Sequence, residues 1–248
     1  MILKRLALLL FGATAAAALL SCSATLQPSQ AGSAPTAASD DGADLQAIYS
    51  DMGRAGGSVF ALVPQDSQVR IYAFRAGRAA SPGHNHVISA PQFTGFFYLP
   101  PSGAANRRSD LVFRLDQLEI DNSGYRSELG AAFSSVLSPE AIQSTREHLL
   151  GADDPQADRF PFVRIRSLQI SGETPKFAAK AQVQMHGQER DMWIPIDVEG
   201  LPERLSVTSS FVLRQSDFGV QPYSLPGGLL SVQDEVVLDF GLTGHLSA

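Results

Sequence analysis

The sequence predicts a mainly β protein with about eight antiparallel strands and one or two short helices. Three observations support this fold class. Apolar and polar residues alternate along several segments, two further segments change phase midway, and one helix carries clear start and stop signals. Strict alternation indicates strands with one buried and one wet face.

The clearest strands lie in the second half of the chain. Leu238 and Phe240 flank Asp239, and Met192 and Ile194 likewise alternate with polar neighbours. Successive side chains of a strand point to opposite faces, so each of these segments predicts one apolar face. The segments with this alternation are 177–186, 190–199, 204–214 and 236–243.

Two earlier strands, at 111–121 and 163–170, switch their apolar face midway. One extra residue produces such a switch, so we expect β-bulges near Asp116-Gln117 and Arg166-Ser167. Further strands are expected at 67–75 and 86–99. Six or more one-sided strands need cover for their apolar faces, so either two sheets stack or one sheet closes. A closed sheet of about eight strands holds its own side chains or one small ligand.

One helix is expected after Ser138. Ser138 is a suitable N-cap, Pro139 suits the first helical position, and Gly151 follows the last turn. Ala141, Ile142, Thr145 and Leu149 share one face of this helix. A second helical turn or two is expected within 126–136.

The start of the chain has the features of a bacterial export signal. Lys4 and Arg5 precede the uncharged apolar run 6–20, which is too short to span a bilayer comfortably. Ser21-Cys22 then resembles a lipobox, in which the Cys is acylated and becomes the first mature residue. We therefore expect a signal peptide at 1–21 and a lipid anchor at Cys22. The alternative is an ordinary signal peptide with a Cys nearby by chance.

The anchor predicts where the protein resides. Ser23 after the Cys is typical of lipoproteins sorted to the outer membrane, so we expect an exported protein that faces the periplasm. Few large apolar residues occur up to residue 44, which indicates a flexible tether, and 45–54 has room for one or two helical turns. The expected organisation is signal peptide 1–21, lipidated Cys and tether 22–57, and one β domain 58–248.

Charge and motifs exclude several function classes. Removal of the signal leaves 17 basic and 25 acidic side chains, a balance of −8. Such an acidic chain without a dense basic cluster is a poor nucleic-acid binder. No G-x-S-x-G or H-E-x-x-H motif occurs, and Cys22, the sole Cys, is assigned to the anchor. We therefore expect no enzyme activity and no catalytic residues.

The most distinctive short motif is Gly83-His84-Asn85-His86. In an extended segment His84 and His86 point to the same side, and imidazole is a common metal ligand. His186 is a third candidate from another strand. The interpretation we favour is a polar turn whose His side chains form hydrogen bonds with the loop backbone. A structural zinc site needs four ligands, but Cys22 is assigned to the anchor and no carboxylate lies beside the His pair in the sequence. A metal- or redox-associated accessory role for His84 and His86 stays as the alternative.

Several segments, in their order and spacing, resemble the YceI-like family of polyisoprenoid-binding proteins. The resemblance covers roughly 58–245. The segments that carry it are Asp66–Ile71, Gly83–His86, Ala157–Ile165, Met185–Gly187, Ser216–Val220 and Val232–Val236. This resemblance implies an extended, lipocalin-like antiparallel β-barrel whose apolar interior holds a long isoprenoid or quinone-like tail. The stretch 125–150 looks like an insertion, and its helix could cap the mouth of the barrel.

The function expected from these observations is binding or carriage of a long apolar ligand inside the barrel, by a protein attached to the membrane through Cys22. No cofactor is expected other than an isoprenoid or quinone as ligand. The candidate lining residues are taken from the apolar strand faces: Val69, Ile71, Phe113, Leu115, Val183, Met185, Met192, Ile194, Phe211, Leu213, Leu238 and Phe240.

Overall fold

The computed structural model describes residues 41–81, 83–101, 106–151 and 157–247. The proposed signal peptide, Cys22 and most of the tether lie outside these residues. Within the described residues, no helix is long and apolar enough to cross a membrane. The described residues belong to one compact unit.

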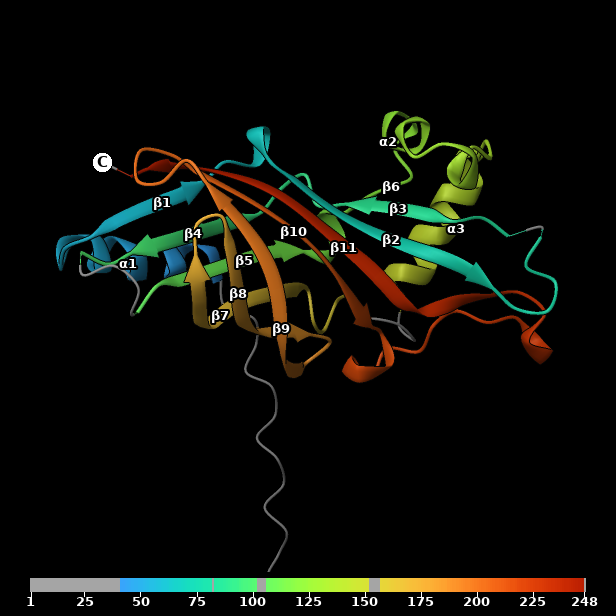
Figure 1. The fold of residues 1–248 in the computed structure, drawn as a ribbon. Helices are drawn as coiled ribbons and strands as arrows, with labels where there is room; N and C mark the ends of the chain where they lie inside the picture. Colours follow the sequence, from blue (N-terminus) through green and yellow to red (C-terminus); the bar gives the residue numbers. More distant parts are fainter. Residues whose placement is uncertain (1–40, 82, 102–105, 152–156, 248) are drawn as a thin grey trace, which may run out of the picture. The chain divides into compact units, whose positions relative to one another are not determined.

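The described part of the chain contains eleven strands and three α-helices (Figure 1). The helices are α1 (Asp41–Arg54), α2 (Ser123–Glu128) and α3 (Pro139–Leu150). The strands are β1 (Ser58–Leu62), β2 (Gln68–Ala76), β3 (His86–Ser89), β4 (Thr94–Leu99), β5 (Arg108–Arg114), β6 (Glu119–Ile120), β7 (Phe162–Glu173), β8 (Lys176–Met185), β9 (Gln188–Glu199), β10 (Leu205–Arg214) and β11 (Ser231–Leu246).

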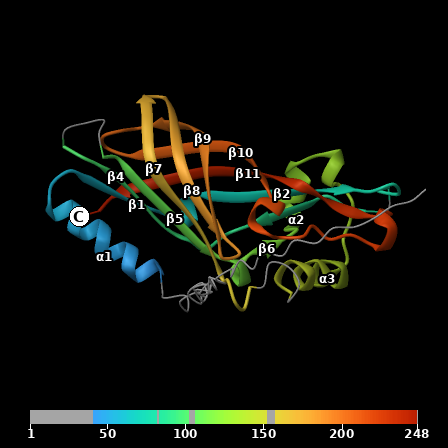
Figure 2. The same cartoon turned by 90° about the horizontal axis from the view of Figure 1, so that it is seen from below.

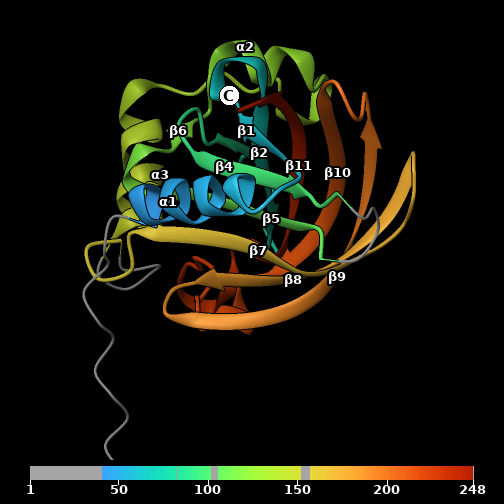
Figure 3. The same cartoon turned by 90° about the vertical axis from the view of Figure 1, so that its left-hand side faces the viewer.

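Eight of these strands close into an antiparallel barrel in the order β1-β4-β5-β7-β8-β9-β10-β11. The ring closes where β1 pairs with the end of β11, with Phe60 opposite Leu246. Figure 3 shows these strands curving around one interior. The prediction of a mainly β, lipocalin-like barrel of about eight strands is therefore confirmed.

The barrel has a side branch that the sequence does not reveal. One edge of β11 is shared, because its residues 231–241 pair with β2 and its residues 244–246 pair with β1. Strands β3 and β6 continue the sheet outward from β2. Near this branch the interior is bounded on one side by β2 and β3, and α3 lies over β6.

One of the two expected bulges is present as predicted. The β7–β8 register shifts between Ser167 and Gln169. At Leu115–Gln117 the chain instead makes a 3-10 turn that separates β5 from β6. The phase change there marks the end of one strand and the start of another, which produces the same switch of apolar face as a bulge.

Helix α3 follows the predicted signals. It begins after Ser138, whose hydroxyl accepts a hydrogen bond from the Ala141 N–H at 3.2 Å, and it ends before Gly151. Ile142 and Leu149 pack against the main core. Arg146 on the same helix donates to the backbone carbonyls of Asp116 and Leu118, which fixes α3 beside the entry to β6.

Helix α1 departs from the expected tether, because residues 41–54 form almost four helical turns. Leu45 and Tyr49 are fully buried, and the Tyr49 ring stacks on Phe96 with 5.0 Å between centroids. The Tyr49 hydroxyl donates to Asp110 at 3.0 Å. Leu45, Ile48, Tyr49 and Met52 recur at helical spacing, so packing against the sheet stabilises a helix that is weak by itself. Figure 2 shows α1 and α3 at opposite ends of the barrel.

Candidate ligand-binding site

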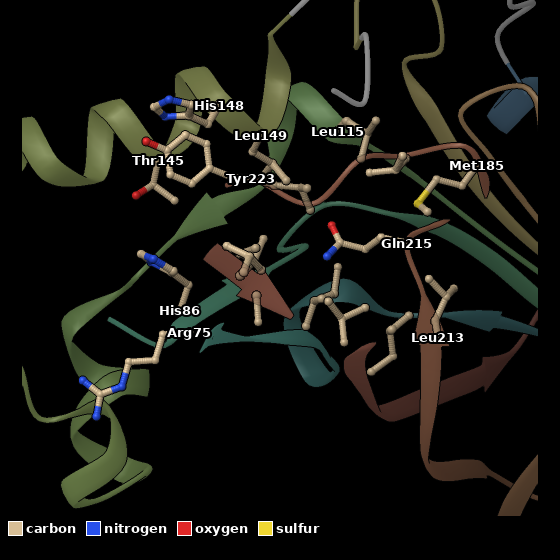
Figure 4. Close-up of a pocket in the computed structure, with 18 of the residues that line it drawn as sticks. Arg75, His86, Leu115, Thr145, His148, Leu149, Met185, Leu213, Gln215 and Tyr223 are labelled. Carbon is tan, nitrogen blue, oxygen red and sulfur yellow. The ribbon is translucent and has the colours of Figure 1, made fainter. Parts of the chain in front are cut away.

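A cavity of about 330 Å³ lies inside the barrel at the end where β2 and β3 branch off. Small-molecule sites typically occupy about 300–1,000 Å³, so this volume is near the lower end of that range. Most of its wall is apolar (Figure 4). The apolar side chains come from several barrel strands, from β2 and β3 and from α3, and they include Ile71, Ile88, Phe113, Leu115, Leu118, Leu149, Val163, Val183, Met185, Leu213, Val220, Val232, Val236 and Leu238.

Seven of the twelve candidate lining residues border this cavity: Ile71, Phe113, Leu115, Val183, Met185, Leu213 and Leu238. They lie on β2, β5, β8, β10 and β11, or directly after β5 in the case of Leu115. Each belongs to the apolar phase of its segment, so strand periodicity alone was sufficient to find them.

The other five candidates lie elsewhere in the barrel. Ile194 and Phe240 line a second, deeper cavity of about 80 Å³. Val69 and Phe211 are buried in the core, and Met192 is half-buried against it. They face inward as expected but lie farther along the barrel than the main cavity. Periodicity gives the face of a residue and not its depth along the barrel.

A layer of three of these residues stands between the two cavities. The rings of Phe211 and Phe240 pack with 5.5 Å between their centroids, and Val69 lies opposite Phe240 in the β2–β11 register. Leu213 and Leu238, two residues away on the same strands, line the main cavity. The Phe211–Phe240 pair therefore lies behind Leu213 and Leu238, next to the deep end of the main cavity.

The opposite end of the cavity is polar. His86, Thr145, His148 and Tyr223 gather there, whereas Leu115, Met185 and Leu213 lie toward the other end (Figure 4). His148 is exposed, and its ring packs edge-on against Tyr223 at 4.4 Å. This end is therefore the mouth of the cavity. The full polar set on the wall is Arg75, His84, His86, Ser144, Thr145, His148, Gln215, Tyr223 and Ser231.

Helix α3 supplies the part of the wall that our candidate set lacked. Ser144, Thr145, His148 and Leu149 border the cavity, so the helix covers one side of the mouth. The shared face of Thr145 and Leu149 was visible in the sequence. What the sequence did not show is that this face lies against the cavity.

His86 is the centre of a buried polar network at the mouth. Its Nδ1 lies 2.6 Å from Asp121, whose side chain is fully buried. Asp121 also accepts hydrogen bonds from the Val87 N–H at 3.1 Å and from Arg126 at 2.6 Å. Burial raises the pKa of Asp121, but the hydrogen bonds from His86, Val87 and Arg126 outweigh burial and hold that pKa below its usual range.

Arg126 completes this network. It is 6% exposed and also donates to the Asn85 carbonyl at 2.7 Å and to the Ser135 hydroxyl at 2.9 Å. The His84 ring meets the same hydroxyl through Nδ1 at 3.0 Å. The pKa of His84 is lowered, first by burial and then by the nearby His86 and Arg126. The network ties the His84–His86 loop to the segment that follows β6.

The predicted metal candidates are not brought together as a ligand set. Within the described ranges, no group of three or more His, Cys, Asp or Glu side chains is arranged to hold a metal ion. His84 and His86 point their Nδ1 atoms at Ser135 and Asp121. His186 lies apart from them, because its Nδ1 donates to the Phe218 carbonyl at 3.0 Å and its ring packs against Phe160.

A family model for the YceI-like domain matches residues 89–243. The chain belongs to the YceI-like family. The match spans β4 to β11, so it contains seven of the eight barrel strands, and the His84–His86 loop lies just before it. Membership of this barrel family is consistent with the binding of an apolar ligand.

Several solved structures resemble this chain. The crystal structure of Burkholderia cenocepacia BcnA is 13% identical, with a TM-score of 0.52 over 73% of this chain and 98% of that chain. The Campylobacter jejuni YCEI protein is 10% identical, with a TM-score of 0.48 over 65% and 85%. At such identity the likeness to BcnA shows the fold alone. No curated protein matches the sequence.

Proposed function

We propose that this protein binds an isoprenoid- or quinone-like molecule inside its barrel, without chemical turnover, while Cys22 anchors it to a membrane. The observation that carries the proposal is the cavity of about 330 Å³, whose wall is mostly apolar and whose polar side chains gather mainly at the mouth. This arrangement suits a ligand with a small polar head and an apolar body.

Burial of the apolar body drives binding in this proposal. Apolar surface removed from water contributes roughly 25 cal/mol per Å², from which the cost of ordering the ligand is subtracted. The ligand enters tail first, because the mouth is polar and the opposite end is lined mainly by apolar side chains such as Leu213 and Leu238, with Phe211 and Phe240 packed behind them. Only a short chain, or the first units of a longer one, fits in a cavity of this volume.

The anchor is the second part of the proposal. Three acyl chains on Cys22 exceed the two signals that stable membrane attachment requires. With Ser23 after the Cys, we propose attachment to the outer membrane, facing the periplasm. Since α1 begins at Asp41, the tether between the anchor and the folded unit is shorter than the stretch 22–57 expected from composition.

Lipid mass spectrometry tests the ligand. The mature protein is purified from membranes of its own host, and co-purifying molecules are extracted and compared with those of an Ala73→Phe variant. Ala73 borders the cavity, so the larger side chain occupies the space of the ligand. An isoprenoid or quinone that is present in the wild type and depleted in the variant supports the proposal. A wild-type barrel that is empty and takes up no quinone in solution refutes it.

Metabolic labelling with a palmitate analogue tests the anchor. We expect label on the wild-type protein, none on Cys22→Ala, and release of the variant from the membrane fraction. Ser23→Ala is the matched control, because it changes a neighbouring small residue and leaves the acylated thiol in place. Unlabelled wild-type protein contradicts this part of the proposal.

A further inference from the structure

His86 is the polar group at the mouth whose hydrogen bonding is most tightly defined. Its side chain is 17% exposed and borders the cavity. Its Nδ1 lies 2.6 Å from Asp121, while its Nε2 makes no hydrogen bond to any residue that the structure describes. One ring nitrogen of His86 is therefore hydrogen-bonded within the protein, and the other is available to a ligand in the cavity.

The network decides which nitrogen carries the proton. Asp121 receives the Val87 N–H and the Arg126 guanidinium on one oxygen, and His86 on the other. Its lowered pKa keeps the carboxylate ionised at neutral pH, and an ionised carboxylate only accepts hydrogen bonds. The His86 proton must then be on Nδ1. In the neutral ring this leaves Nε2 as an acceptor.

The geometry points to a head-group subsite, in which His86 Nε2 accepts a hydrogen bond from a neutral hydroxyl on an otherwise apolar ligand. This inference rests on the proposed function and narrows its ligand class to amphiphiles that end in an alcohol or a phenol. Asp121 and Arg126 act as positioning residues, because they fix the tautomer and the orientation of the ring without touching the ligand.

Charge disfavours an anionic head at this point. The Asp121 carboxylate and the Arg126 guanidinium neutralise each other, and the two terminal nitrogens of Arg126 also donate to Asn85 and Ser135. Arg75, an arginine on the cavity wall, donates through Nη1 to the carbonyls of Ser81 and Gly83, which orient its side chain but do not neutralise its charge. At Nε2 itself a carboxylate or phosphate would meet a lone pair, while the Arg126 guanidinium beside His86 is already paired with Asp121.

The other histidines at the mouth are less suited to this role. His148 donates from Nδ1 to the Ser144 carbonyl at 2.7 Å, but its ring is exposed, so water competes for its Nε2. His84 meets a hydroxyl, which both donates and accepts, so its tautomer is not fixed. His86 alone among these three faces a buried carboxylate.

Calorimetric titration of the purified full-length protein with three short amphiphiles tests the inference. The probes are farnesol, farnesyl methyl ether and farnesoic acid, which share a tail and differ in the head. We expect farnesol to bind roughly three- to tenfold more tightly than the ether, the usual worth of one hydrogen bond, and more tightly than the acid. Equal affinities of alcohol and ether, or tighter binding of the acid, overturn the inference.

The variant His86→Phe assigns any preference to this ring. It keeps an aromatic side chain and removes the acceptor, so the alcohol-to-ether affinity ratio should fall to about one while the ether still binds. His148→Phe is the matched control, because it removes another cavity histidine and should leave the ratio unchanged. A ratio that persists in His86→Phe overturns the inference.

A measurement on the wild-type protein covers the case in which His86→Phe fails to fold. Long-range ¹H–¹⁵N correlation spectra report the protonation of each imidazole nitrogen. We expect His86 to carry its proton on Nδ1, and its Nε2 resonance to shift with farnesol and not with the ether. A proton on Nε2 overturns the subsite. Failure of all three probes to bind argues against the proposed function instead, and leaves the tautomer measurement as the separate test of the network.

Discussion

Replacement of Arg126 by Met tests whether the network at the mouth is a buried charge balance. Arg126 is 6% exposed and pairs at 2.6 Å with a carboxylate that has no exposed surface. Removal of one partner of a buried pair leaves the other charge uncompensated, at a cost of about 3–5 kcal/mol. For a domain of this size each kcal/mol lowers the melting temperature by about 2–4 °C, so we expect a drop of about 6–20 °C.

Urea denaturation followed by far-UV circular dichroism measures this cost. Arg214→Met is the matched control, since Arg214 pairs with Glu235 on an exposed surface and should lose no more than about 1 kcal/mol. In the double variant Arg126→Met/Asp121→Asn no bare charge remains, so part of the loss should return as a coupling of about 0.5–3 kcal/mol. A loss in Arg126→Met no larger than in the control, or a double variant whose losses simply add, refutes the reasoning.

Four further predictions follow from the packing and the charges. Phe211→Ala removes one ring of the Phe211–Phe240 pair, so it should shift binding preference toward longer tails in a prenol chain-length series. It should also lower the free energy of unfolding by about 3–5 kcal/mol. An unchanged chain-length preference contradicts the placement of this pair at the deep end of the cavity. Ala73→Phe should abolish farnesol binding at a stability cost of about 1–3 kcal/mol, and full binding by the folded variant would place the ligand elsewhere. Leu45→Ala should cost about 2–5 kcal/mol if α1 is docked in solution, whereas a loss under about 0.5 kcal/mol indicates that α1 is detached. The pKa of Asp121 is lower in the folded state, so ionised Asp121 stabilises the fold above its unfolded pKa of about 3.9, and this contribution disappears as pH falls through the folded pKa. The difference in melting temperature between wild type and Asp121→Asn should therefore shrink in acid. A difference that widens in acid contradicts a lowered pKa for Asp121.

The sequence was sufficient for the barrel because side-chain alternation reports directly on strands. Leu238, Phe240 and their neighbours have no other arrangement that buries one face and wets the other. The helix from Pro139 to Leu150 was equally accessible, because its cap and its first proline are local signals. Local signals therefore sufficed for this helix, whereas the phase change at Asp116-Gln117 was assigned to a bulge and is a 3-10 turn between two strands.

Features that depend on distant partners were not readable. Helix α1 is stabilised by contacts of Tyr49 with Phe96 and Asp110, which are far along the chain, so the sequence suggested only one or two helical turns at 45–54 within a tether. Asp121 follows a two-residue strand in a segment that resembles any polar loop, and nothing local marks it as the partner of His86. The branch of β2, β3 and β6 likewise depends on how β11 divides one edge between two strands.

The two ends of the cavity impose different constraints on a ligand. At the deep end the Phe211–Phe240 pair limits how much tail can enter, and this limit is steric, so it acts equally on ligands with any head. At the mouth the His86 acceptor responds to the head alone and is held in position by Asp121 and Arg126. Because the deep aromatic layer and the mouth network share no residue, tail length and head chemistry should be separable by mutation. A substitution at Phe211 should alter chain-length preference and leave the alcohol-to-ether ratio intact, and a substitution at His86 should do the reverse.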